Sequence, residues 1–74
     1  MSANDRDRVH FAVWLLGKLA KAWDMTPADA YRILQRERIV SDYIVQFYDP
    51  LHTMGELALV EDVTLLARSR GLAV

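Results

Sequence analysis

The chain has 74 residues, a formal net charge of −1 and 53% hydrophobic residues, and it contains no cysteine. This length allows one small domain, residues 1–74, and the composition excludes a disordered chain, a disulfide scaffold and a thiolate zinc site. The near-neutral charge provides no basic field that would collect nucleic acid, and the longest apolar run, six residues at 11–16, is far shorter than the roughly 20 that span a membrane.

The first predicted helix covers residues 5–23 and follows a frayed tail at residues 1–4. Asn4 is a good N-cap, and Asp5 and Asp7 put negative charge in the first turn, where the helix dipole favours it. The helical period then predicts one buried face, which consists of Val9, Ala12, Val13, Leu16, Leu19, Ala20 and Trp23.

A second, partly apolar face of this helix carries Phe11, Trp14 and Leu15. A helix that is apolar nearly all round is usually buried on more than one side, which would make this helix central. A domain this small can hardly enclose one helix completely, however, and tryptophan is favoured at interfaces. We therefore predict that Phe11, Trp14 and Leu15 form a contact surface for another protein chain, either a different partner or a second copy.

The second predicted helix has the clearest start. Thr26 is its cap, Pro27 occupies the first helical position, and Asp29 the third. We expect this helix to end between residues 36 and 38. Its apolar side consists of Ala30, Tyr31 and Leu34.

A short third helix is predicted over residues 42–48, with Ile44, Phe47 and Tyr48 facing inward. A strand is the competing prediction, because segment 43–48 is rich in aromatic and β-branched residues. We favour the helix because the sequence offers no second strand to pair with.

The last helix is predicted to begin at Thr53, which forms a capping box with Glu56, and to end before Gly71. Its apolar stripe contains Leu57, Val60, Val63, Thr64 and Ala67, widened by Leu59 and Leu66. The fold class is therefore an all-α bundle of about four helices, with long first and last helices and a short third helix.

Asp49 and His52, beside Tyr48, are the residues that suggest acid–base chemistry or a metal site. The only other histidine, His10, is on the first helix, and the sequence has no HExxH motif, no nucleophilic cysteine and no glycine-rich phosphate loop. We interpret Asp49 as an acceptor of backbone N–H groups and His52 as locking the loop through a buried hydrogen bond. The sequence predicts no catalytic group, metal ion or cofactor.

Arg32, Arg36 and Arg38 are the candidates for a phosphate or nucleic-acid contact. Acidic residues are interspersed among them, and a helix-turn-helix built from helices 2 and 3 would present an apolar and acidic surface to DNA. We therefore expect a solvated face rather than a nucleic-acid interface.

The segment 42–55 resembles a known family. Its order is Asp42-Tyr43-Ile44, then Tyr48-Asp49, then Leu51-His52-Thr53 with Gly55, followed by an acidic, valine-rich helix. This pattern resembles a bacterial family of small domains of unknown function, numbered 3791, with Pro50 in place of a more usual aliphatic residue. The resemblance extends from about residue 9 to residue 71.

Members of that family are often encoded beside a larger protein similar to ADP-ribosyltransferases. The resemblance therefore implies a toxin–antitoxin or effector–partner pair. The absence of catalytic motifs and the second apolar face of the first helix predict a non-enzymatic interaction module, an antitoxin-like partner that neutralises a toxin-like protein. The alternative is a small enzyme or a regulatory subunit that uses Asp49 and His52. The charged segment 5–8 does not resemble a signal peptide, so we expect a cytoplasmic protein with no membrane contact.

Overall fold

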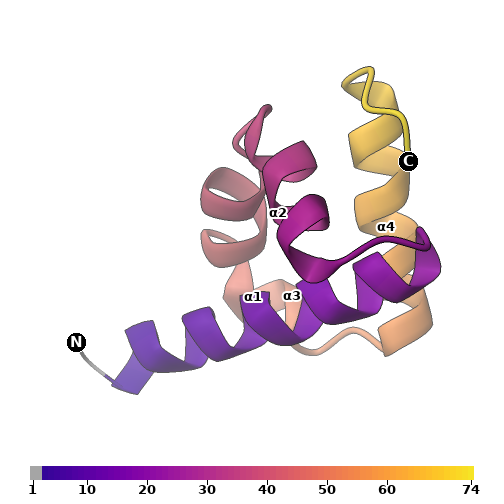
Figure 1. Ribbon diagram of the computed structural model, residues 1–74. Coiled ribbons are helices and arrows are strands. Elements are labelled where there is room, and N and C mark those ends of the chain that lie inside the picture. The colour runs from indigo at the N-terminus through magenta and orange to yellow at the C-terminus, as the bar shows by residue number, and fades with distance from the viewer. Residues whose placement is uncertain (1–2) are drawn as a thin grey trace.

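The computed structural model describes residues 3–74, and these residues form helices and connecting turns with no strand (Figure 1). The helices are α1 (Ala3–Ala22), α2 (Pro27–Gln35), the π-helix η1 (Val40–Val45), α3 (Tyr48–Leu51) and α4 (Glu56–Ser69). The predicted all-α class is confirmed, and the competing strand at 43–48 is not formed.

The core lies where α1 meets α2, η1 and α4. In Figure 1, α1 runs beneath α2, and α4 rises beside the C-terminal half of α1. The largest fully buried side chains come from all of these segments and from the turn before η1. They are Leu15, Leu19, Leu34, Ile39, Ile44, Leu59 and Val63. Burial of a side chain of this size stabilises the fold by roughly 1.5–3 kcal/mol.

Helix α1 buries most of its predicted face, including Ala12, Leu16, Leu19 and Ala20, but the buried arc is shifted around the helix. Val9 and Val13 are 44% and 63% exposed, whereas Leu15 is completely buried. The prediction that Leu15 belongs to a partner surface is therefore wrong. The reason is that α2, η1 and α4 all pack on the side of α1 that includes Leu15, so the buried arc is displaced from the predicted stripe.

The start of α1 also differs from the prediction. The helix begins at Ala3, so Asn4 lies inside it and is not its cap. Of the predicted frayed tail, residues 3 and 4 are helical and residues 1 and 2 lie outside the described residues.

Helix α2 begins as predicted. The Thr26 hydroxyl accepts a hydrogen bond from the Asp29 N–H at 3.1 Å, and Pro27 is the first helical residue. Beyond the ends of α1 and α2, Asp24 and Arg38 have φ angles of 55° and 56°. These residues end the two helices in the left-handed conformation, a position that glycine usually occupies.

The predicted short helix over 42–48 is replaced by two segments, η1 and α3. Ile44 is buried as predicted, but Phe47 lies between the two segments and is 48% exposed. Pro50 lies inside α3 rather than ending a helix. It is tolerated because it falls in the first turn, where backbone N–H groups have no partner within the helix.

Helix α4 begins at Glu56, so the predicted capping box is wrong. Its N-cap residue is Gly55, which has no side chain, and the Thr53 hydroxyl donates backwards to the Pro50 carbonyl at 2.8 Å. Leu59, Val63 and Ala67 form the buried face of this helix, whereas Leu57, predicted to be inward, is 83% exposed. Across residues 3–74, none of the helices has the length and apolar character needed to cross a membrane.

Candidate functional site

Four aromatic rings form a continuous row across α1 and α3. The Trp14 and Phe11 ring centroids are 6.0 Å apart, and Phe11 meets Tyr48 edge-on at 5.4 Å. The Tyr48 ring stacks on the His52 ring at 4.4 Å, with an angle of 11° between the planes. We call Trp14, Phe11, Tyr48 and His52 the aromatic row.

Helical spacing explains how the row forms. Phe11 and Trp14 are three residues apart on α1, so their side chains lie on neighbouring parts of the same face. Tyr48 and His52 are four residues apart, and the His52 N–H donates to the Tyr48 carbonyl at 2.8 Å, which places the two rings one above the other. Phe11 then joins the two pairs.

Two basic side chains lie beside the row, one at its Trp14 end and one at the Tyr48 ring. The Arg8 guanidinium is 5.7 Å from the centroid of the Tyr48 ring, and the Lys18 ammonium is 6.0 Å from that of Trp14. Both distances allow a cation–π attraction. Each cation also approaches a carboxylate, Lys18 with Glu56 at 3.3 Å and Arg8 with Asp49 at 3.7 Å.

Arg8 is the functional-site residue that the sequence analysis missed. Its guanidinium donates to the carbonyl of Val45 at 2.5 Å and to that of Gln46 at 3.2 Å. These carbonyls lie at the C-terminal end of η1, where backbone acceptors lack partners within the helix. The contacts join residues 37 and 38 positions apart, so no local pattern could reveal them.

His52 and Asp49 do not act as one unit. The His52 side chain is exposed, and its Nδ1 lies 2.9 Å from the Tyr48 carbonyl oxygen, so the predicted buried lock is wrong. The Asp49 side chain is 76% exposed and its carboxylate faces Arg8 rather than a buried turn. The histidine is thus engaged with Tyr48 and the aspartate with Arg8.

The other residues of the predicted motif have separate structural roles. Leu51 is buried in the core, and Glu56 begins α4 and pairs with Lys18. A Cβ atom added at Gly55 would meet nothing within 4 Å, so steric crowding does not require glycine there. His10 is exposed on α1, and residues 3–74 contain no group of histidine and carboxylate side chains arranged to hold a metal ion.

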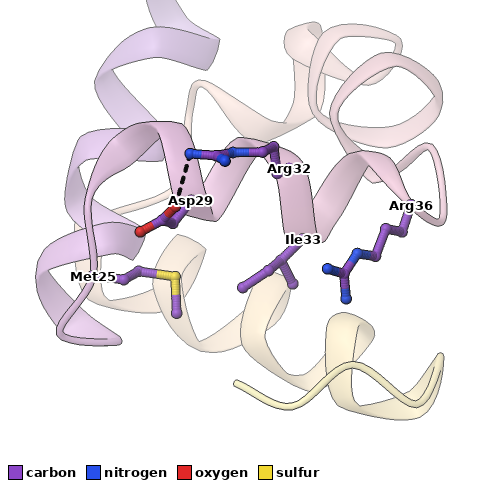
Figure 2. A pocket seen from close by; sticks show the side chains of 5 residues that line it. All are labelled: Met25, Asp29, Arg32, Ile33 and Arg36. Carbon is purple, nitrogen blue, oxygen red and sulfur yellow. Dashed lines mark hydrogen bonds and ion pairs between the residues drawn. The ribbon is translucent and has the colours of Figure 1, made fainter.

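The predicted arginine cluster is largely neutralised by neighbouring carboxylates. Arg32 lies 2.9 Å from Asp29, and Arg38 lies 3.0 Å from Asp42. Figure 2 shows Arg32 and Arg36 at a pocket of about 290 Å³. Its lining residues are Met25, Asp29, Arg32, Ile33 and Arg36. Two of the three arginines therefore belong to surface ion pairs rather than to a free phosphate-binding surface.

Tyr43 links η1 to α4. Its hydroxyl donates to a carboxylate oxygen of Asp62 at 2.5 Å. Burial, followed by the hydrogen bond to Asp62 and its negative charge, raises the pKa of Tyr43 to about 12. The phenol therefore remains a hydrogen-bond donor at neutral pH, and it fixes the orientation of the Asp62 carboxylate.

The helical fold and the partly exposed aromatic row define a small all-α domain with a row of four rings across its surface. The chain belongs to the family described as "Protein of unknown function (DUF3791)", whose model matches residues 10–69. The matched range includes all four residues of the aromatic row. No curated protein and no solved structure matches the chain.

Proposed function

We propose that this domain is a non-enzymatic protein-interaction module that binds its partner through the aromatic row. The observation that carries the proposal is the position of Trp14, which is 42% exposed at the end of a contiguous row of rings. Tryptophan and tyrosine dominate the binding energy of many protein interfaces because they bury a large area with few rotatable bonds.

A hollow next to the row supports this proposal. Lys18, which lies over the Trp14 ring, also lines a hollow of about 200 Å³ that contains Leu57. Leu57 is 83% exposed, so the row and the hollow together present rings, an aliphatic side chain and a cation. An apolar side chain of a partner could insert into this hollow, next to the aliphatic parts of Lys18 and Lys21.

The family resemblance supports the identity of the partner. We infer that the domain acts in the cytoplasm as the small neutralising, antitoxin-like partner of a larger ADP-ribosyltransferase-like protein. The alternative, an enzyme or a regulatory subunit that uses Asp49 and His52, has less support because these two residues have different neighbours.

The test is co-expression of the domain with an ADP-ribosyltransferase-like protein from the same genome, followed by capture and a binding titration. We expect Trp14→Ala to weaken association by about 2 kcal/mol while the helical circular dichroism is retained. Tyr31→Ala is the matched control, because Tyr31 is an aromatic residue of similar exposure, 45%, on α2. Equal affinities of the two variants would contradict the proposed docking surface.

The enzyme alternative has its own readout in the same system. If His52→Ala abolishes a biological activity while capture of the partner is unchanged, the interaction proposal fails and catalysis at His52 replaces it. If His52→Ala changes capture alone, the residue serves the aromatic row.

A further inference from the structure

A second surface lies along α4 and the turn that precedes it. It is a groove of about 330 Å³ lined by Met54, Ala58, Glu61, Asp62 and Leu65. The Met54 and Leu65 side chains are 36% and 58% exposed. We call these five residues the α4 groove.

The groove exists because α4 has apolar residues on two faces. Leu59 and Val63 point into the core, whereas Ala58 and Leu65 recur at helical spacing on the side that no other helix covers. The Tyr43 hydroxyl is hydrogen-bonded to Asp62 of the groove, and the Tyr43 ring lies 5.7 Å from that of Phe47. Phe47 is itself 48% exposed.

The charge of the groove is uncompensated within the described part of the chain. Among the described residues, Asp29, Asp42, Asp49 and Glu56 each lie within 4 Å of a basic nitrogen. Between residues 3 and 74, no lysine, arginine or histidine nitrogen lies within that distance of Glu61 or Asp62. Asp62 is moreover held in place by the Tyr43 hydroxyl, so its carboxylate is oriented before any partner arrives.

We propose that the α4 groove binds a basic amphipathic helix of another protein. A large aliphatic side chain of that helix lies between Met54 and Leu65, and a lysine or arginine one turn away pairs with Glu61 and Asp62. An apolar groove with a charged edge suits the helix-in-groove mode of recognition, in which residues three or four positions apart supply the anchors. The negative charge selects a cationic partner and repels anionic lipid and nucleic acid.

This inference is independent of the aromatic row. The two surfaces share no residue, and the α4 groove contains carboxylates, whereas cations lie beside two rings of the row. A variant of one surface therefore leaves the other intact, and the two proposals can fail separately.

The experiment is a titration of the whole domain with a synthetic amphipathic peptide of leucine and lysine, about 15 residues long so that it can form a helix. Binding is followed by calorimetry, and amide chemical shifts locate the site. We expect the shifts to centre on Met54 and Leu65. Glu61→Lys and Leu65→Ser are each expected to weaken binding about tenfold or more, the first through charge and the second through lost apolar contact.

Two variants serve as controls, and circular dichroism verifies that every variant is folded. Glu37→Lys makes the same charge change at an exposed site after α2, so it reports attraction by net charge alone. Trp14→Ala alters the aromatic row. Both are expected to bind the peptide as the unaltered domain does.

Three results would overturn the proposal. The first is equal weakening by Glu37→Lys and Glu61→Lys, which would mean non-specific charge attraction. The second is equal binding of a peptide in which glutamate replaces lysine. The third is self-association in sedimentation that both Glu61→Lys and Arg36→Glu abolish, which would assign the groove to a second copy of this chain.

Discussion

The two tryptophans of the chain lie nine positions apart and have opposite environments. Trp23 follows α1, packs against the core and donates its indole N–H to the Thr64 hydroxyl at 3.0 Å, which ties the end of α1 to α4. Trp14 belongs to the same helix, but its ring is 42% exposed and its neighbours are Phe11 and Lys18.

The difference shows that the position of a residue in the bundle, not its type, decides what a large aromatic side chain does. Helix α4 packs against α1 and provides Trp23 with a hydrogen-bond acceptor, whereas Trp14 is exposed and contacts Phe11 and Lys18. Changes around Trp23 should therefore reduce stability, and changes around Trp14 should reduce binding. The following predictions test this division, from the largest expected effect to the smallest.

Leu15→Ala should destabilise the domain by about 3 kcal/mol, because truncation of a fully buried leucine removes apolar contacts and leaves a cavity. Urea denaturation followed by circular dichroism measures the loss. Trp14→Ala, one residue away, is the control and should lower the free energy of unfolding by far less. A loss at Trp14 as large as that at Leu15 would contradict the division between the buried and the exposed face of α1.

Arg8→Ala should destabilise the domain by about 2 kcal/mol, since it removes charged hydrogen bonds to the end of η1. Arg8→Lys should restore only part of this loss, because an ammonium group cannot reproduce the fork of the guanidinium. The measurement is the midpoint of thermal or urea unfolding. An unaltered midpoint in Arg8→Ala would show that these contacts do not hold the N-terminal part of α1 to η1.

Thr64→Val should cost about 1 kcal/mol, because it removes the acceptor of the Trp23 N–H while keeping the shape of the side chain. In a Trp14→Phe background Trp23 is the only remaining tryptophan, so its fluorescence during urea unfolding reports this site alone. Stability equal to that of the Trp14→Phe parent would show that packing, and not the hydrogen bond, fixes Trp23.

His52→Ala should change stability by less than about 0.5 kcal/mol, because the imidazole is exposed and stacks on only one ring. Thermal unfolding monitored by circular dichroism measures the difference, with Tyr31→Ala as a comparison on another helix. A loss above about 1 kcal/mol would exceed what a solvent-exposed side chain normally contributes and would make His52 part of the fold.

Local sequence signals predicted the fold class and several helix boundaries. The Thr26–Pro27 start is correct because the cap and its partner are three residues apart, so their hydrogen bond depends only on neighbouring residues. The Thr53 cap failed although it matched the same kind of pattern. Its hydroxyl has a competing acceptor, the Pro50 carbonyl, which only the folded turn brings within reach.

The rotation of α1 could not be predicted from its sequence. Apolar residues surround most of this helix, and both Val13 and Leu15 are compatible with burial by pattern alone. The choice depends on where α2, η1 and α4 pack, which exposes Val13 and buries Leu15. For the same reason, the sequence predicted only part of the aromatic row. Phe11 and Trp14 were identified as a surface, but their contact with Tyr48 and His52 depends on long-range packing.

The left-handed residues Asp24 and Arg38 have a consequence for how this domain can change over time. Each holds a side chain in a conformation that costs an L-residue roughly 1–2 kcal/mol and costs glycine little. A single substitution to glycine at either position would therefore add stability without touching the core or either docking surface. That reserve would let a lineage accept destabilising changes at Trp14 or in the α4 groove while it acquires a new partner.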